Sequence, residues 1–334
     1  MKTYAIYLAK RLLQFVLVVF IGINLTYVIS HATPIDPVEQ TISALTSFGN
    51  TSPEAIETMR ESLRELYGMS GTPLEQYVSF WSRIVVGDFG PSLSAFPTPV
   101  SELILRALPW TIGLLVVATV LAWLLGNLLG GLAGYYRKNR LLKAMGLIAM
   151  GLHPMPYYVV AFVLLVVFGF LWPVLPISGG SGIGVGRGFS FDFISSVLLH
   201  SLLPALSLVV VGLGGWFLGM RALVSNIVTE DYVVYAELGG VDRRRILTSY
   251  VMRNALVPQV TGLAMSLGAI FTGAIITEEV FGYPGIGSLL VDAVHAGDYS
   301  LVLGITSVSI VAVSLAVLVI DLLYPLLDPR VQVE

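Results

Sequence analysis

The residues best suited to chemistry in this chain are the charged side chains of one short stretch, DYVVYAELGGVDRRRILTSYVMRNALVP, residues 231–258. Its acids and arginines are Asp231, Glu237, Asp242, Arg243, Arg244, Arg245 and Arg253. The rest of the chain avoids charge, since only 12% of all residues are Asp, Glu, Lys or Arg, against about 25% in an average soluble domain. These residues alone leave two interpretations open: the stretch docks onto another protein, or its arginines only hold a loop inside the cell and touch anionic lipid headgroups.

The other reactive side chains do not form a recognisable catalytic, nucleotide or metal site. No lysine follows a glycine, so the GxxxxGK phosphate-binding loop is absent. The glycine-rich residues 179–188 lack the strand and helix that a dinucleotide site needs. The histidines are His31, His153, His200 and His295, without HxxxH or HxxE spacing, and there is no cysteine. We therefore expect no catalytic residue, no metal and no cofactor bound by this chain.

His153 stands between Leu152 and Pro154 in an apolar stretch, where an ionisable side chain suggests a function. One interpretation is a neutral imidazole that binds a carbonyl left free by Pro154 or Pro156. The other is a contact with a transported substrate. We favour the first, because proline removes the backbone donor that would otherwise bind such a carbonyl.

The elements that must position these residues are membrane-spanning helices. Hydrophobic residues make up 56% of the chain, and its charge-free stretches match the roughly 20 apolar residues that cross a bilayer. Each must be helical, because a segment in lipid has to satisfy its own backbone hydrogen bonds. The predicted spans are Leu12–Ser30, Leu108–Gly134, Ala144–Leu175, Phe193–Met220, Asn254–Thr277 and Tyr299–Ile320. The sequence therefore predicts an all-α, polytopic membrane protein with six transmembrane helices, the first being too long for a cleaved signal peptide.

Lysine and arginine in short loops predict the orientation, because these residues are retained on the cytoplasmic side. They precede the first span, separate spans two and three, separate spans four and five, and follow span six. These residues are Lys2, Lys10 and Arg11; Arg137, Lys138, Arg140 and Lys143; Arg221, Arg243, Arg244, Arg245 and Arg253; and Arg330. The opposite short loops hold only Arg187. Both termini are therefore expected in the cytoplasm.

The segment between the first two spans, residues 31–107, is the one sizeable part expected outside the membrane. A helix is predicted over Ser52–Leu66, with Ser52 as N-cap and Pro53 in the first helical position. A second helix is predicted over Pro73–Val86. The segment is too short for an independent enzyme domain, so we interpret it as an external scaffold rather than a dedicated binding site.

A polytopic chain without a catalytic constellation is a channel, a transporter or an assembly subunit. The spans carry no buried carboxylate or basic pair of the kind common in ion-driven carriers, so energy is expected from a partner. The second span has a small-residue strip for close helix contact, Gly126, Gly130, Gly131 and Gly134. The fifth span has polar residues that are candidates for the substrate pathway, Gln259, Thr261, Ser266 and Thr272.

The charged stretch resembles the cytoplasmic loop of permease subunits of ATP-binding-cassette importers, in the dipeptide, oligopeptide and nickel uptake family. The shared positions are Asp231-Tyr232-Val233, Ala236, Gly240, Arg244-Arg245, and Arg253-Asn254-Ala255-Leu256 with Pro258. The resemblance continues in the family's order through AKRLL (9–13), GDFGPSL (87–93), PVSELI (99–104), EEVFGYPGIGSLLVDAV (278–294) and DLLYPLLDPRV (321–331). One departure is the triplet at residues 234–236, Val-Tyr-Ala, where the archetypal importer loop has Glu-Ala-Ala.

The resemblance implies a type I importer permease fold that lies in the cytoplasmic membrane of a bacterial or archaeal cell and works by alternating access. It implies as partners a homologous second permease, two ATP-binding subunits that use ATP and magnesium, and an external substrate-binding protein. A coupling helix is expected over Tyr232–Leu247, broken at Gly240 and seated in a groove of an ATPase subunit. Its coupling residues would be Tyr232, Ala236, Glu237, Gly240, Arg244 and Arg245. Peptides are the first expected substrates, oligosaccharides or nickel chelates are alternatives, and a secondary carrier or a channel is less favoured.

The resemblance and the spans together suggest three regions. Residues 1–30 would form the cytoplasmic N-terminus and first span, residues 31–107 the external scaffold, and residues 108–334 a five-span core. Within this core, residues 221–253 would form the cytoplasmic coupling loop.

An outer gate is predicted at FGYPGIG, residues 281–287, where a Tyr-Pro turn and several glycines allow the chain to bend. Bending would place the apolar residues Ile286, Leu289 and Leu290 over the external mouth of the pathway. Glu278 and Phe281 belong to the same candidate site. The alternative is an ordinary hairpin that holds spans five and six together.

Overall fold

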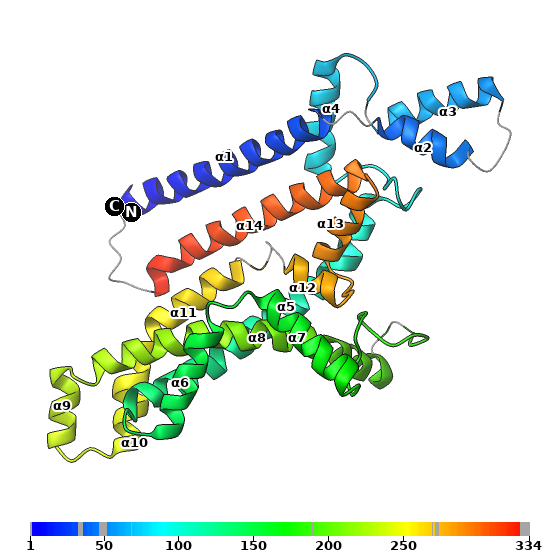
Figure 1. The fold of residues 1–334 in the computed structure, drawn as a ribbon. Helices are drawn as coiled ribbons and strands as arrows, with labels where there is room; N and C mark the ends of the chain where they lie inside the picture. Colours follow the sequence, from blue (N-terminus) through cyan, green and yellow to red (C-terminus); the bar gives the residue numbers. More distant parts are fainter. Residues whose placement is uncertain are drawn as a thin grey trace.

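The computed structural model describes residues 2–32, 36–46, 52–67, 69–186, 188, 190–268, 270 and 274–327. Over these ranges the chain is helical, with one isolated bridge between Pro91 and Pro99 and no β-strand (Figure 1). The prediction of an all-α protein is confirmed. The elements are α1 (Lys2–Ala32), α2 (Pro37–Thr46), α3 (Pro53–Leu66), α4 (Pro73–Val86), α5 (Val100–Tyr135), α6 (Arg140–Leu152), α7 (Tyr157–Leu165), η1 (Val166–Leu171), α8 (Phe191–Ile227), α9 (Asp231–Leu238), α10 (Arg243–Arg245), η2 (Ile246–Met252), α11 (Arg253–Gly268), α12 (Ile275–Val280), α13 (Ile286–His295) and α14 (Tyr299–Leu327).

Four helices are long and apolar enough to cross a membrane. They contain the segments Ile6–Ile29, Val100–Tyr135, Phe191–Ile227 and Tyr299–Leu322. A fifth span would form if α6 and the helix of residues 157–171 were counted together, although these two are bent by 105°. The chain is therefore a multi-pass membrane protein, but six spans are not confirmed.

The two differences from six straight spans have local causes. The predicted third span, Ala144–Leu175, is interrupted at residues 153–156, where Pro154 and Pro156 cannot continue the helical hydrogen bonds. The predicted fifth span, Asn254–Thr277, begins within α11, which continues directly from η2 and ends at Gly268, before the predicted end of the span. After α11, residues 269 and 271–273 lie outside the described part of the chain.

The centre of the bundle is a close contact between α5 and α8. Gly126, Gly130 and Gly134 lie on the seam, and a Cβ atom on Gly130 would overlap the backbone of Phe217. A Cβ atom on Gly134 would come within 2.8 Å of the Val224 side chain. The absence of side chains lets the two backbones approach, as expected for small residues at helix contacts in membranes. Three glycines of the predicted strip thus form the contact surface for α8, whereas the fourth, Gly131, faces Met252 of η2.

The segment between the first two spans contains the helices that the sequence predicts. Ser52 caps α3 by accepting a hydrogen bond from the backbone N of Ala55, and Pro53 occupies the first turn. Residue Thr72 caps α4 and forms a reciprocal capping box with Glu75. On α4, the ring of Trp81 stacks on Phe20 of α1, with ring centroids 5.4 Å apart. These contacts fix α4 against the end of α1 that lies farthest from Lys2.

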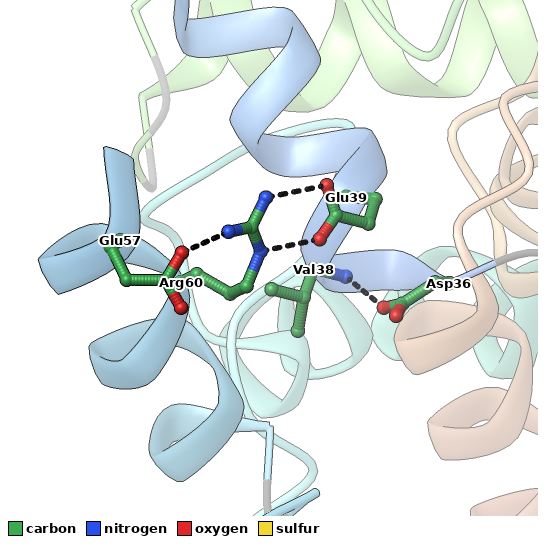
Figure 2. Close-up of polar contacts among 5 residues, drawn as sticks. All are labelled: Asp36, Val38, Glu39, Glu57 and Arg60. Atoms are coloured by element: carbon green, nitrogen blue, oxygen red, sulfur yellow. Dashed lines mark hydrogen bonds and ion pairs between the residues drawn. The ribbon is translucent and has the colours of Figure 1, made fainter. Parts of the chain in front are cut away.

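The helices α2 and α3 form a hairpin with its own small core, which projects from the bundle (Figure 1). Val38, Ile42 and Leu63 are buried in it. Figure 2 shows Arg60 between Glu39 and Glu57, with Arg60 Nε donating to Glu39 Oε1 over 2.6 Å. This hydrogen bond holds the pKa of Glu39 below its usual value.

The basic turns gather at one end of the molecule, opposite α2, α3 and α4 (Figure 1). Arg137, after α5, donates a hydrogen bond to the backbone O of Ser225 near the end of α8. The hydroxyl of Tyr135 contacts the backbone O of Arg243 at 3.4 Å. The α5–α6 turn and the charged stretch therefore share one surface.

Candidate functional site

The first candidate site is built on α9, which is anchored to the bundle through one face. Val233 and Ala236 are buried, and they pack with Met220 and Val224 of α8 and with Ile246 of η2. The Nδ2 atom of Asn254 donates to the hydroxyl of Tyr232 over 3.1 Å. This packing sets the direction of α9 relative to the long helix α8.

The opposite face of α9 is apolar and exposed. Tyr235 is 72% exposed and Leu238 is 79% exposed, while Tyr232 and Val234 are about half as accessible at 41% each. Glu237 is also exposed. Large apolar side chains at the exposed end of a helix are typical of a surface that contacts another protein or a membrane.

The turn after α9 directs the arginines away from the bundle core. Gly240 has a backbone φ of 73°, a conformation that residues with a side chain rarely adopt, and space is open around it. The carboxylate of Asp242 then accepts a hydrogen bond from the backbone N of Arg244 over 3.0 Å. Arg244 and Arg245 are exposed. The site thus combines an apolar helix face with exposed cations.

One feature of this site agrees with the sequence prediction and one differs from it. The predicted coupling helix, Tyr232–Leu247, is divided near Gly240, because α9 ends at Leu238 and the chain restarts at Arg243 in a helix that leads into α11. Ala236, predicted as a coupling residue, faces inward and is 9% exposed. Its small side chain positions α9 on the bundle, and the apolar surface comes from Tyr235 and Leu238.

The second candidate site is the turn between α12 and α13, which brings Glu278, Phe281, Ile286 and Leu289 together. Glu278 is fully buried, and Phe281 is 1% exposed in a cluster with Ala161 and Leu203. Ile286 and Leu289 are half-buried against the N-terminal ends of α5 and α14. A cavity of about 50 Å³ lies beside Ile286, between α5 and α14. The turn is therefore packed on its own chain on several sides.

The polar pathway candidates of α11 lie apart from this turn. Gln259 is 7% exposed, and its backbone O accepts a hydrogen bond from Trp123 Nε1 of α5. Thr261 and Ser266 are half-buried, and the hydroxyl of Thr261 binds the backbone O of Val257. Thr272 lies outside the described residues. The described pathway candidates of α11 and the gate candidates of the α12–α13 turn therefore do not form one site in this structure.

His153 ends α6 at the bend before α7. Its ring lies beside Gly215 of α8, where a Cβ atom would come within 3.1 Å of Cε1. The residue is exposed at the bend between α6 and α7 rather than enclosed in a continuous span. In the described part of the chain, no three His, Cys, Asp or Glu side chains are grouped in a way that could hold a metal.

Sequence reasoning missed two buried polar groups that join distant segments. Thr111 of α5 donates to Glu278, and Asp298 accepts hydrogen bonds from the serines of the outer loop. Thr111 lies in an apolar helix and Asp298 in a turn, so neither stands out by spacing. The one signal was the Pro-Ser-Leu-Ser sequence at residues 91–94, which the resemblance includes in part.

Comparison with known proteins agrees with this architecture. Residues 126–333 match the family described as binding-protein-dependent transport system inner membrane component. The chain is 28% identical to the oligopeptide transport system permease protein AppB of Bacillus subtilis, over 98% of this chain and 99% of that protein. It is 31% identical to the probable D,D-dipeptide transport system permease protein DdpB of Escherichia coli, over 97% of this chain and 96% of that protein.

The match extends across most of the described helices, including α8, α9, α11 and α14, and the full-length similarity also includes the outer segment. The resemblance found in the loop motifs is therefore confirmed along the chain. This protein belongs to the family of inner membrane components of binding-protein-dependent transport systems, in which it is a permease subunit.

Proposed function

We propose that this chain is the permease subunit of an ATP-driven importer of peptides. The names of its relatives support peptides over oligosaccharides or nickel chelates, since they are oligopeptide and dipeptide permeases. A second, homologous permease would complete the pathway, two ATPase subunits would supply energy from ATP and magnesium, and an external binding protein would deliver the peptide.

The observation that carries this proposal is the exposed apolar face of α9 beside exposed arginines. Tyr235 and Leu238 project from a helix whose other face is packed on α8 and η2. A displacement of α9 would therefore be transmitted to α8 through the packed side chains of Val233 and Ala236. We propose that this face sits in a groove of an ATPase subunit, with Glu237, Arg244 and Arg245 at its edge.

The same proposal places the basic end of the bundle in the cytoplasm and residues 31–107 outside. Support comes from the exposed cations Arg137, Lys138 and Arg140 at the same end as α9. The packing of α4 on the far end of α1 would make the outer segment a scaffold at the external mouth. Ile286 and Leu289 would then lie near that mouth and contribute to an outer gate.

A crosslinking experiment tests the position of the ATPase. Leu238→Cys in the assembled complex should form a covalent bond with a cysteine introduced in the ATPase groove, whereas Leu74→Cys, equally exposed on α4, should not. Membrane vesicles containing the complex should accumulate labelled di- and oligopeptides only with ATP and binding protein. Peptide accumulation without ATP, or no crosslink from residue 238, would contradict the proposal.

A further inference from the structure

The start of α13 is held by the carboxylate of Glu278, which lies in the preceding helix α12. Glu278 Oε1 accepts a hydrogen bond from the hydroxyl of Thr111 over 2.7 Å. Its Oε2 accepts from the backbone N of Gly287 over 2.6 Å and of Ser288 over 3.3 Å. The hydroxyl of Thr111 also accepts from the backbone N of Ile286 over 2.8 Å. One buried carboxylate and one hydroxyl of α5 thus satisfy the first backbone donors of α13.

The turn after α13 carries a second buried carboxylate, which reaches the loop before α5. Asp298 is fully buried between α13 and α14. Its Oδ2 accepts from the hydroxyl of Ser92 and from the backbone N and hydroxyl of Ser94, the last two over 2.9 and 2.8 Å. Its Oδ1 accepts from the backbone N of Leu301 over 3.0 Å. The loop before α5 is therefore tied to the first turn of α14.

Apolar packing fills the space between these two carboxylates. Ala293 of α13 packs with Val100 and Ile104 of α5 and with Leu301 and Ile305 of α14. Close contact continues at Gly304, where a Cβ atom would overlap the side chain of Val100. The helix α13 is thus enclosed by α5 on one side and α14 on the other.

The turn before α13 is also held by several groups and leaves little freedom for bending. The hydroxyl of Tyr283 lies 2.9 Å from the hydroxyl of Ser201 in α8, and its ring meets the ring of Trp110 edge to face. The backbone O of Phe281 accepts from the backbone N of Gly179 over 2.9 Å. A Cβ atom on Gly285 would overlap the carboxylate of Glu278. Gly285 is therefore needed because it lets the Glu278 carboxylate come close to the backbone, and not because it makes the turn flexible.

From these contacts we propose that Glu278 and Asp298 are positioning residues that fasten α13 to α5, α14 and the outer loop. Residues 88–111 and 278–304 then move as one body, called here the outer body. Opening of the external side displaces this body as a unit, and the turn at residues 281–287 does not act as a hinged flap. The inference rests on the proposed import function, and it specifies how the outer gate moves.

A removable covalent bond tests whether the outer body moves as a unit. Val100→Cys and Gly304→Cys place two thiols within bonding range, because a Cβ atom on Gly304 overlaps the Val100 side chain. This chain has no cysteine of its own. Oxidation of the double variant in the reconstituted importer should leave the peptide uptake rate within twofold of the reduced form. Loss of uptake on oxidation, with recovery on reduction, would overturn the proposal.

The same bond tests the role of Asp298, because it joins the same two segments. Asp298→Asn alone should lower the uptake rate about tenfold, since an amide nitrogen cannot accept the hydrogen bonds of a carboxylate oxygen. In the triple variant, oxidation should restore uptake to within twofold of the parent, and reduction should remove it again. A residue needed only for folding would not respond to oxidation after assembly. Asp292→Asn, an exposed acid of α13, is the matched control and should have no effect. No recovery on oxidation would count against Asp298 as a fastening residue.

Hydrogen exchange gives a readout that needs neither peptide nor transport. The amides of residues 286–288 should exchange at similar slow rates in complexes trapped without nucleotide and with an ATP analogue. Glu278→Gln should raise their exchange rate at least tenfold, and Glu279→Gln, its exposed neighbour, should not. Fast exchange in one trapped state would show a hinged turn and overturn the proposal. If the exchange rates are as expected but labelled peptides are not imported, the proposal of a rigid outer body is supported and the proposed import function is wrong.

Discussion

Trp123 of α5 donates a hydrogen bond from its indole Nε1 to the backbone O of Gln259 in α11, over 2.9 Å. This bond joins two helices next to Pro258, which interrupts the regular bonding of α11. The side chain of Gln259 lies toward Gly219 of α8, where a Cβ atom would come within 3.2 Å of Nε2. Residue 259 therefore belongs to a three-helix contact among α5, α8 and α11.

We expect Trp123→Phe to lower the stability of this contact by about 1 kcal/mol, the usual net value of one hydrogen bond. Thermal unfolding of the purified complex in detergent would measure the change. Trp172→Phe is the control, since Trp172 is exposed near the end of η1. Equal effects of the two substitutions would show that the bond to Gln259 contributes no stability.

The seam between α5 and α8 predicts a strong effect of a single methyl group. Gly130→Ala should destabilise the protein by about 1–3 kcal/mol, because the added atom overlaps the backbone of Phe217 and the helices must separate. Gly113→Ala in the same helix has open space around it and should be neutral or slightly stabilising. The unfolding temperatures of the two variants are compared in the same detergent. If Gly113→Ala lowered the unfolding temperature as much as Gly130→Ala, the close contact between α5 and α8 would not explain the effect.

Gly240 predicts a difference between two substitutions of similar size. Its φ of 73° is tolerated by asparagine better than by valine. Gly240→Asn should keep ATP hydrolysis coupled to peptide uptake, whereas Gly240→Val should lower uptake per ATP several-fold because α9 and Arg244 are displaced relative to each other. Both rates are measured in proteoliposomes. Normal coupling in the valine variant would mean that the turn geometry does not matter.

The orientation predicts which introduced cysteines react with a membrane-impermeant maleimide in sealed cells. Val85→Cys on α4 and Ile183→Cys should be labelled, and both positions are highly exposed. Lys138→Cys and Arg244→Cys should be protected until the membrane is permeabilised. Labelling of residue 244 from outside would reverse the assigned orientation.

Acid should loosen the α2–α3 hairpin, because the pKa of Glu39 is lowered by its hydrogen bond from Arg60. The folded pKa lies below the unfolded one, so the stabilisation is present above the usual glutamate pKa, about 4.3. It is lost as the pH falls through the lower folded value. The protection of the amides of residues 38–46, measured relative to the intrinsic exchange rate at each pH, should therefore fall on acidification in the parent protein. Glu39→Gln should already lower this protection at neutral pH and make it depend less on acid, and the same pH profile of protection in this variant as in the parent would refute the role of Glu39.

The sequence could predict the elements whose signals are local. α3 and α4 begin at the predicted residues because a capping side chain and a proline stand together at each start, Ser52 with Pro53 and Thr72 with Pro73. The glycine strip of α5 was readable because helical spacing places its members on one face. The charged stretch was recognised by its composition and by its resemblance to the cytoplasmic loop of importer permeases.

The remaining features depend on contacts that no local pattern encodes. The residues in the bond between Thr111 and Glu278 are 167 positions apart, and those between Ser92 and Asp298 are 206 apart. The packing of the helix after Gly240 on α9 was also missed, because Ile246 and Val251 are buried in one cluster with Val233 and no local pattern shows this contact. Burial against α8, rather than helical periodicity, decides which residues of this stretch face a partner.

Between Thr111 and Tyr135, α5 is a proline-free rod of about 36 Å. Its glycine seam holds it to α8, its inner end contacts the backbone of Arg243, and its outer end carries the hydroxyl that binds Glu278. Such a rod acts as a lever arm, so that a tilt of about 5° moves one end by about 3 Å relative to the other. Under the proposed coupling, a small rotation imposed near α9 would therefore displace Thr111, at the far end of the rod, by a distance comparable to an atomic diameter.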